Sequence, residues 1–491
     1  MAEPARDDRL PALVWVIAAA FVAVELAFSA GYGFQQDELY FIQAGRHLAF
    51  GYVDQPPIAP LLAWLATALG GLHPTAVRAL PALEGGAIVV LAARQAVIFG
   101  AGRIGRVLAA LCMACAPVLI GAVHIANTTP PSLLAWTLVV LCVSTAIARD
   151  RPRWWLGAGV AAGLGLQTNN LLTLLLLALA AGLLLTRRFD VLRTRWPWLA
   201  AGIAAVIWAP NVVWQATHGW PAFAMSASLH RENTSAGDYV GGLPAQILYG
   251  GLFTAPVLIA GVVRLWRTPE LRYLAVTVML TAVYVLAWVP GKPYYTSGLL
   301  PAVLAAGSVA TERWFAWGRR PLVRRTLVVG AVLVATLAAL PTVLPVWPVR
   351  DVHARTTGAD LRNMIGWPQL ASRVAAETSA LTAAGTPPTS IFTGNYAEAS
   401  TLDVLGGPGL PPVLSGHNAY GMWGPGGASD ARVLAVDASD RLRPYFGRCR
   451  TLGTFITPYR VDNDFNHLDL SLCTGPAGDW PALWPHLTHD D

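Results

Sequence analysis

The chain has 491 residues, of which 55% are hydrophobic types and only 13% are charged. A soluble globular protein carries about 25% charged residues, so much of this surface is not made for water. The net charge of +6 does not indicate a nucleic-acid partner, because the basic residues lie in short loops between apolar runs and form no stripe interleaved with aromatic residues. The composition therefore predicts an α-helical polytopic membrane protein.

The apolar runs are long enough to predict about eleven transmembrane helices. We expect them at about 10–30, 79–99, 107–123, 131–148, 155–168, 171–186, 197–213, 244–264, 272–289, 294–310 and 326–343. The first run has the length of a signal peptide, but no small-residue cleavage site followed by a mature domain comes after it. We therefore expect an uncleaved first span.

Arginine is distributed unevenly between the two sets of loops. If the N-terminus is cytoplasmic, most arginines fall in cytoplasmic loops, whereas the outside loops between spans carry only Arg46, Arg78, Arg231 and Lys292. This asymmetry is the positive-inside pattern. It predicts a multi-pass protein of the cell membrane, with the region after the last span outside the cytoplasm.

Three sizeable parts of the chain are not spans, and one of them is the outside loop at about 214–243. The first outside loop, 31–78, contains the segments 37–50 and 57–70, whose apolar faces suit helices lying at the membrane interface. Residues 346–491 are polar and rich in glycine and proline, with an expected helix at 368–384 and expected strands at 390–393, 431–437, 451–456 and 468–473. We therefore predict two domains, a transmembrane module at 1–345 and a small extracytoplasmic α/β domain at 346–491.

The five cysteines divide in the same way. Cys112, Cys115 and Cys142 lie inside apolar runs and are expected to be buried small hydrophobic residues. Cys449 and Cys473 lie in the polar tail, where an oxidising compartment would allow them to pair.

Two adjacent acids, Asp37 and Glu38, follow the first span. A carboxylate costs about 2.5–3.5 kcal/mol at the centre of a membrane and less at its edge, so acids here mark either a function or simple interfacial placement. The plain alternative is that Asp37 caps the following helix.

A rigid turn follows in the same loop, at Asp54-Gln55-Pro56-Pro57. The two prolines fix the backbone and hold Asp54 in one place. The alternative is an ordinary turn initiator. Taken together, Asp37, Glu38 and Asp54 form an acidic group on one outside loop.

The third feature is Gly291-Lys292-Pro293-Tyr294-Tyr295. Lys292 is the only lysine of the chain and can neutralise a phosphate as a point charge. The alternative is that Lys292, Tyr294 and Tyr295 only anchor the chain at the headgroup level.

Other motifs are weak. His417, between Gly416 and Asn418, is the one histidine whose setting suggests contact with a ligand, although a surface turn is the simpler interpretation. The remaining histidines are scattered and suggest no metal cluster. The sequence contains no Walker A, HExxH or GxSxG motif.

The combination of these motifs resembles the GT-C membrane glycosyltransferases. The likeness is greatest to the family 39 group of dolichyl-phosphate-mannose protein mannosyltransferase-like proteins, with the lipid A aminoarabinose transferases as kin. It covers roughly residues 10–345 and rests on Asp37-Glu38, on Asp54-Gln55-Pro56-Pro57, and on 291–295 followed by Pro301. The tail, with the stretches 390–396 and 415–418, looks like the extracytoplasmic domain of a bacterial branch of the family.

The resemblance implies an inverting glycosyltransferase. Its donor would be a sugar on a polyprenyl phosphate, and its acceptor a hydroxyl of a protein, glycan or lipid. Asp37 and Glu38 would be catalytic, with Asp37 as the base that deprotonates the acceptor. The donor phosphate and substrate would be bound by Asp54, Gln55, Lys292, Tyr294, Tyr295 and His417. Metal use varies in the family, so a divalent metal is left open.

Two positions depart from the family pattern. Gln55 stands where the aminoarabinose branch has a lysine, and Ser132 stands where relatives often carry an acid at the start of the fourth span. A catalytically inactive partner subunit is therefore one alternative. The other is a transporter or flippase of lipid-linked glycans, against which count the absence of a repeat in the sequence and the position of the acids at the membrane surface.

Overall fold

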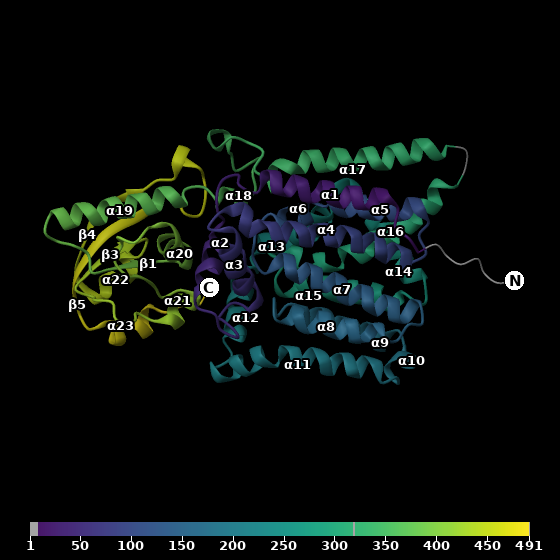
Figure 1. Ribbon diagram of the computed structural model, residues 1–491, viewed down its shortest axis with the longest axis horizontal. Helices are drawn as coiled ribbons and strands as arrows, with labels where there is room; N and C mark the ends of the chain where they lie inside the picture. Colours follow the sequence, from purple (N-terminus) through teal and green to yellow (C-terminus); the bar gives the residue numbers. More distant parts are fainter. Residues whose placement is uncertain (1–7, 318–319, 491) are drawn as a thin grey trace. The chain divides into compact units, whose positions relative to one another are not determined.

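A computed structural model describes residues 8–317 and 320–490 (Figure 1). The chain forms two compact units. The helical unit contains the described residues up to Ser29 together with Arg78–Trp214 and His230–Leu340, and the mixed unit contains Ala30–Val77, Gln215–Leu229 and the chain from Pro341 onward. The predicted domain division at residue 345 stays a prediction, although it falls close to the point where the chain enters the mixed unit for the last time.

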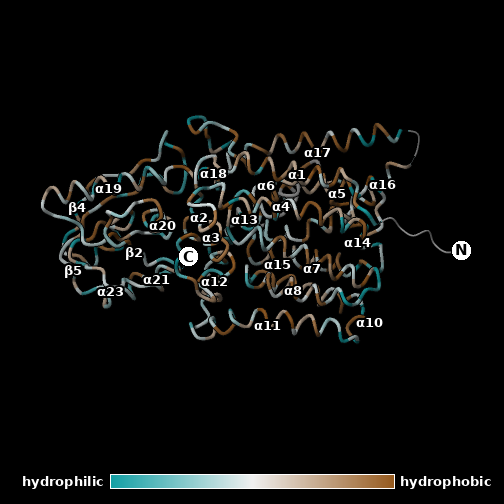
Figure 2. Tube along the Cα trace, in the orientation of Figure 1, coloured by the Kyte–Doolittle hydropathy of each residue, from teal (hydrophilic) through white to brown (hydrophobic). Residues whose placement is uncertain are grey.

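The helical unit is built from the apolar segments, which Figure 2 shows as largely hydrophobic. Its helices are α1 (Ala12–Phe28), α4 (Pro74–Ile98), α5 (Arg103–Ala114), α6 (Pro117–Val123), α7 (Thr129–Ala148), α8 (Trp154–Leu166), α9 (Leu172–Leu185), α10 (Phe189–Leu192), α11 (Trp196–Thr217), α13 (Ala236–Gly250), α14 (Ala255–Arg267), α15 (Arg272–Trp288), α16 (Leu300–Phe315) and α17 (Pro321–Val343). A core of buried apolar residues from α7, α8, α9, α15 and α16 holds these helices together.

Among the residues that the structure describes, four helices, α4, α7, α11 and α17, are long and apolar enough to cross a membrane, and α5 with α6 makes a fifth if the bent pair is one span. Shorter apolar helices include α1, α8, α9 and α15. The helical membrane architecture predicted from the sequence is therefore confirmed. The count of eleven spans and the side of the membrane on which the tail lies stay predictions.

Three predicted spans are interrupted. The 107–123 segment bends by 55° between α5 and α6, where Pro117 has no N–H with which to continue the first helix. The 244–264 segment breaks after α13, at Gly251 with a φ of +97°. The 294–310 segment begins as a 3-10 helix, Pro293–Leu299, and becomes α-helical only from Leu300. The prediction of continuous spans was wrong here because hydropathy does not register such breaks.

The mixed unit combines the predicted first outside loop with the tail and with most of α12 (Pro221–Glu232). The loop forms α2 (Gln36–Arg46) and α3 (Ile58–Gly70), close to the predicted segments. These two helices pack so closely that a Cβ on Gly45 would meet the Pro60 carbonyl oxygen at 2.8 Å.

The tail forms a five-stranded sheet with helices around it. The strands are β1 (Ser390–Thr393), β2 (Val413–Ser415), β3 (Arg432–Val436), β4 (Phe446–Phe455) and β5 (Leu468–Pro476), in the order β2-β1-β3-β5-β4. The strands β2, β1 and β3 pair in parallel, whereas β5 pairs antiparallel with both β3 and β4. The accompanying helices are α18 (Ala359–Arg362), α19 (Trp367–Ala383), α20 (Tyr396–Leu405), α21 (Asn418–Trp423), α22 (Ser439–Leu442) and α23 (Trp480–Leu487).

The predicted α/β character of the tail is confirmed. The expected helix and four expected strands correspond to α19, β1, β3, β4 and β5, whereas β2 was missed. Cys449 and Cys473 lie opposite each other in the β4–β5 register and form a disulfide, while Cys112, Cys115 and Cys142 are free and buried.

Candidate active site

The acidic group begins at the start of α2, where a capping box fixes the backbone. The Gln35 side chain accepts a hydrogen bond from the Asp37 N–H at 2.6 Å, and the Glu38 carboxylate accepts one from the Gln35 N–H at 2.9 Å. The alternative that Asp37 caps the helix is therefore wrong, because Gln35 does so. Glu38 is fully buried and satisfies one of the unpaired N–H groups of the helix start. Its predicted catalytic role stays a prediction.

Asp37 is held by a residue of the tail. The phenol of Tyr396, the first residue of α20, donates a hydrogen bond to Asp37 Oδ1 at 3.0 Å. A hydrogen bond to a carboxylate is stronger than one between neutral groups, and it restricts the direction in which the carboxylate faces. The tail thus orients the acid that the family resemblance implies as the base.

Asp54 has a matching tyrosine on α2. The Tyr40 phenol donates to Asp54 Oδ1 at 3.0 Å and accepts the Ala419 N–H at 3.3 Å. The rings of Tyr40 and Tyr396 lie 4.7 Å apart between centroids, so the two tyrosines bring the two acids into one group. We name Asp37, Asp54, Tyr40 and Tyr396 the carboxylate–tyrosine cluster.

Burial changes the proton affinity of this cluster. It raises the pKa of Asp54 to about 7, and the negative charge of Asp37 adds to the increase, while the hydrogen bond from Tyr40 opposes it. Burial and the neighbouring acids also raise the pKa of Tyr396 well above its usual value, so its phenol keeps its proton. Tyr396 is thus a hydrogen-bond donor at neutral pH.

Gln55 lies beside Asp54 in a tight turn closed by the Tyr52 N–H and the Gln55 carbonyl oxygen at 2.9 Å. Its side chain is only 2% exposed, and neither polar atom of the amide has a hydrogen-bond partner among the described residues. A buried amide usually has partners, because leaving it unpaired costs about 1–3 kcal/mol. The amide of Gln55 is therefore available to a bound molecule, and its predicted contact with the donor stays a prediction.

His417 supports Tyr396. It is 5% exposed, its Nδ1 accepts the Tyr396 N–H at 3.4 Å, and its ring stacks on His489 at 4.5 Å between centroids. The alternative of a surface turn is wrong, because the ring is buried. These contacts fit a residue that positions Tyr396, and the predicted contact with substrate stays a prediction.

A second set of side chains joins α2 to α20. Asp403 accepts hydrogen bonds from Tyr420 at 2.7 Å and from Gln43 at 3.1 Å, and burial raises the pKa of Asp403 to about 6. Sequence reasoning missed Tyr40, Tyr396, Asp403 and Tyr420. The only signal was the stretch 390–396, which entered through the family resemblance and not as a site.

The remaining predicted residues lie in the helical unit. Tyr294 and Tyr295 line a small cavity of about 30 Å³ together with Ser132, Asn169, Trp136 and other residues of α7 and the α8–α9 connection. Ser132, the departure from the family pattern, thus lies in the same cavity as the two tyrosines. Lys292 lies near Asp238 at the start of α13, where the Ser235 hydroxyl and then the charge of Lys292 lower the pKa of Asp238.

The structure therefore places the predicted residues in two groups, one in each unit. Asp37, Glu38, Asp54, Gln55 and His417 belong to the mixed unit, and Lys292, Tyr294 and Tyr295 belong to the helical unit. The expectation that all of them form one site stays a prediction.

A divalent metal stays a prediction. Among residues 8–317 and 320–490, no group of three or more histidine, cysteine or acidic side chains is arranged to hold an ion. Asp37 and Asp54 supply two carboxylates, and Mg²⁺ is commonly bound by one or two carboxylates together with the phosphates of a substrate.

Comparison with known sequences gives a partial family match. Residues 54–214 match the family model described as dolichyl-phosphate-mannose-protein mannosyltransferase. No curated protein sequence matches the chain significantly.

Comparison with solved structures identifies the fold. The chain is similar to ArnT from Cupriavidus metallidurans, solved bound to undecaprenyl phosphate, with a TM-score of 0.60 and 16% identity over 93% of this chain and 97% of that one. ArnT in the apo state matches with a TM-score of 0.60 and 14% identity over 94% and 97% of the two chains. The mycobacterial arabinofuranosyltransferase AftD matches with a TM-score of 0.51 and 13% identity, over 94% of this chain and 41% of that one. The predicted GT-C fold is confirmed.

Proposed function

We propose that the protein is a membrane glycosyltransferase that moves a sugar from a polyprenyl-phosphate donor to a hydroxyl acceptor on the extracytoplasmic face. The observation that carries this proposal is the carboxylate–tyrosine cluster, in which Tyr396 orients Asp37 at 3.0 Å on a fold shared with ArnT. Two partly buried carboxylates in one cluster are costly unless they serve a purpose. The family match over residues 54–214 supports the same reaction class.

The reaction is a single displacement. The acceptor oxygen attacks the anomeric carbon, the bond between that carbon and the phosphate oxygen breaks, and polyprenyl phosphate leaves with the bonding electrons. The acceptor proton passes to the Asp37 carboxylate, which acts as general base. One displacement inverts the configuration of the anomeric carbon.

The other predicted residues take binding roles in this proposal. Lys292 is the cation for the donor phosphate, and Tyr294 and Tyr295 border the small cavity beside Ser132. Gln55, with its unpaired buried amide, contacts the sugar or the phosphate. The acceptor is a hydroxyl of a protein, glycan or lipid.

The test uses the purified full-length protein in detergent. Short-chain polyprenyl phosphates carrying mannose, glucose, galactose or arabinose serve as donor probes, a lipid extract of the native membrane serves as acceptor, and release of polyprenyl phosphate is measured. We expect one donor to be consumed, and we expect Asp37→Asn to lower the rate by 10²–10⁴-fold, the usual contribution of a general base. Asp440→Asn is the control, because Asp440 is an exposed residue of α22.

Unchanged transfer by Asp37→Asn would remove Asp37 as the base. Movement of an intact lipid-linked glycan across reconstituted vesicles, without a covalent product, would instead establish a flippase. Activity that appears only after a second protein is added would establish a partner subunit.

A further inference from the structure

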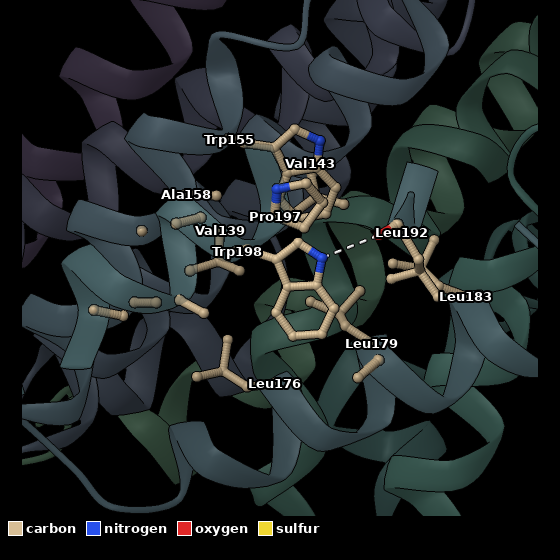
Figure 3. Close-up of a pocket in the computed structure, with 16 residues that line it drawn as sticks. Val139, Val143, Trp155, Ala158, Leu176, Leu179, Leu183, Leu192, Pro197 and Trp198 are labelled. Carbon is tan, nitrogen blue, oxygen red and sulfur yellow. Dashed lines mark hydrogen bonds between the residues drawn. The ribbon is translucent and has the colours of Figure 1, made fainter. Parts of the chain in front are cut away.

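A cavity lies in the helical unit, apart from the predicted site residues. It has a volume of about 250 Å³ and is lined by residues of α7, α8, α9, α10 and α11 (Figure 3). Its lining includes Val143, Ala158, Leu179, Leu192 and Trp198, and every lining side chain is apolar or aromatic. The indole N–H of Trp198 donates to the Leu192 carbonyl oxygen at 3.0 Å, so this polar group is already satisfied.

The cavity suits hydrocarbon. An engineered apolar cavity of roughly 150 Å³ stays dry and binds benzene, and this one is larger. The cavity opens beside the apolar outer surface of α11. Only 22% of the membrane-spanning window of α11 is buried inside the protein, and Trp198 is 67% exposed. A flexible acyl chain therefore has both the space and an entrance.

The chain segments that flank the lining helices are basic. Exposed arginines lie next to the start of α8, the end of α9 and the connection from α10 to α11, namely Arg151, Arg153, Arg187, Arg193 and Arg195. Arg188 is used in a bidentate ion pair with Asp190. Within the described chain, Arg153, Arg187 and Arg193 form no ion pair, so their charges are available to an anion.

The cavity differs from the small cavity beside Tyr294. That cavity contains Ser132, near the start of α7, whereas this one contains Val143, near its end. The axis of a helix rises roughly 16 Å between these two residues. The larger cavity is thus at the arginine-rich end of the bundle, the end predicted to face the cytoplasm.

From these observations we propose that this cavity binds an acyl chain of an anionic phospholipid, with the lipid phosphate at Arg153, Arg187 and Arg193. The occupant is a membrane phospholipid and not the polyprenyl donor, because Arg153 follows the end of α7 in the chain, whereas Tyr294 lines the cavity at the start of α7. Basic pockets between transmembrane helices on the cytoplasmic side are known to bind anionic head groups. The bound lipid fills the space between α8, α9 and α11.

The test measures lipid retention by native mass spectrometry. The purified full-length protein is delipidated in detergent and incubated with phosphatidylglycerol or with phosphatidylethanolamine of the same acyl chains. We expect at least fivefold more retained phosphatidylglycerol. Ala201→Phe, which fills the cavity from an exposed lining position on α11, abolishes this preference, whereas Ala205→Phe, one turn further on and outside the lining, preserves it.

Charge variants test the head-group contact. The double variant Arg153→Gln/Arg193→Gln reduces phosphatidylglycerol retention at least fivefold, while Arg267→Gln, an exposed arginine at the end of α14, leaves it unchanged. Ala180→Phe, at an exposed lining position on α9, replaces Ala201→Phe if that variant does not fold. Equal retention of the two phospholipids, equal behaviour of the 201 and 205 variants, or displacement of phosphatidylglycerol by undecaprenyl phosphate would each overturn the proposal.

Discussion

The hydrogen bond between Tyr396 and Asp37 decides how the proposed base is presented. A phenol that donates to one carboxylate oxygen fixes the plane of the carboxylate, and small errors in the placement of a catalytic group are costly. The phenol itself is placed by His417 and by the ring of Tyr40. The position of one oxygen atom therefore depends on a chain of buried neighbours.

Removing the phenol oxygen of Tyr396 tests how much the orientation of the Asp37 carboxylate contributes to the rate, because the carboxylate itself is kept. We expect Tyr396→Phe to lower kcat by about tenfold with little change in KM, because the carboxylate remains but is no longer held in its reactive direction. Steady-state kinetics with the donor that the proposed transfer assay identifies would measure kcat and KM of this variant. Tyr459→Phe, at a tyrosine that is 71% exposed, serves as the control, and an increase in KM alone would contradict the positioning role.

Asp54 makes stability depend on pH. Its pKa is raised to about 7 in the folded protein by burial, so the folded state binds a proton that the unfolded state releases above pH 4. Stability is therefore lost as pH rises from about 4 to 7, by up to about 1.4 kcal/mol per pH unit. We expect Asp54→Asn to flatten this dependence and to be more stable than the parent protein at pH 7.5. Unfolding followed by circular dichroism at several pH values measures both, and parallel profiles would contradict the assignment.

At the scale of elements, α2 is the connection between the first outside loop and the tail. Its N-terminus is closed by Gln35 and Glu38, and its buried face meets α20 through Tyr40, Ala44 and Ala399. An eleven-residue helix has little stability alone, so these tertiary contacts and the cap maintain it. The helix carries Asp37 at its second residue, where fraying would otherwise be greatest.

Variants of Glu38 distinguish a role in capping α2 from a role in catalysis. We expect Glu38→Ala to destabilise the protein by about 1 kcal/mol, because the Gln35 N–H loses its acceptor, whereas Glu38→Gln keeps an acceptor and most of the activity. Thermal unfolding and transfer rates are measured together. Loss of activity by Glu38→Gln as large as that of Asp37→Asn would instead make Glu38 catalytic.

The sequence predicted the elements whose pattern is local. The helix α19 and the strands β1, β3, β4 and β5 were found because composition and periodicity mark them. The strand β2 has three residues after two prolines, too few for a pattern. The break at Gly251 depends on a backbone angle that hydropathy does not contain.

The sequence predicted the acids of the candidate site but not the tyrosines that contact them. Asp37 and Asp54 stand out because acids are rare beside apolar runs. Tyr40 and Tyr396 do not stand out, since buried tyrosines are ordinary and Tyr396 lies 359 residues from the acid that it contacts. Family resemblance supplied candidate residues, and only the three-dimensional structure supplied their partners.

At the scale of the whole molecule, arginine distribution sets an expectation for orientation. The same end of the bundle that carries Arg151, Arg187 and Arg193 would face the cytoplasm, and the tail with its disulfide would face an oxidising compartment. Within the helical unit, the predicted topology then assigns the small cavity with Tyr294 and Tyr295 to the outer leaflet and the lipid cavity to the inner leaflet.

Orientation can be measured with a membrane-impermeant thiol reagent. In right-side-out vesicles we expect Ala384→Cys, at an exposed tail position after α19, to react, and Thr194→Cys, between α10 and α11, to react only after the membrane is opened. The native free cysteines are buried and give a low background. Labelling of Thr194→Cys in intact vesicles would contradict the predicted orientation.

The composition of the mixed unit has a consequence for biosynthesis. The loop with Asp37 leaves the ribosome long before α20 is made, because Tyr396 follows Asp37 by 359 residues. Until translation is nearly complete, the nascent loop has no partner for its carboxylates and no cover for the apolar face of α2. A chain that ends before Tyr396 would therefore contain every helix up to α17 but would lack the phenol that holds Asp37.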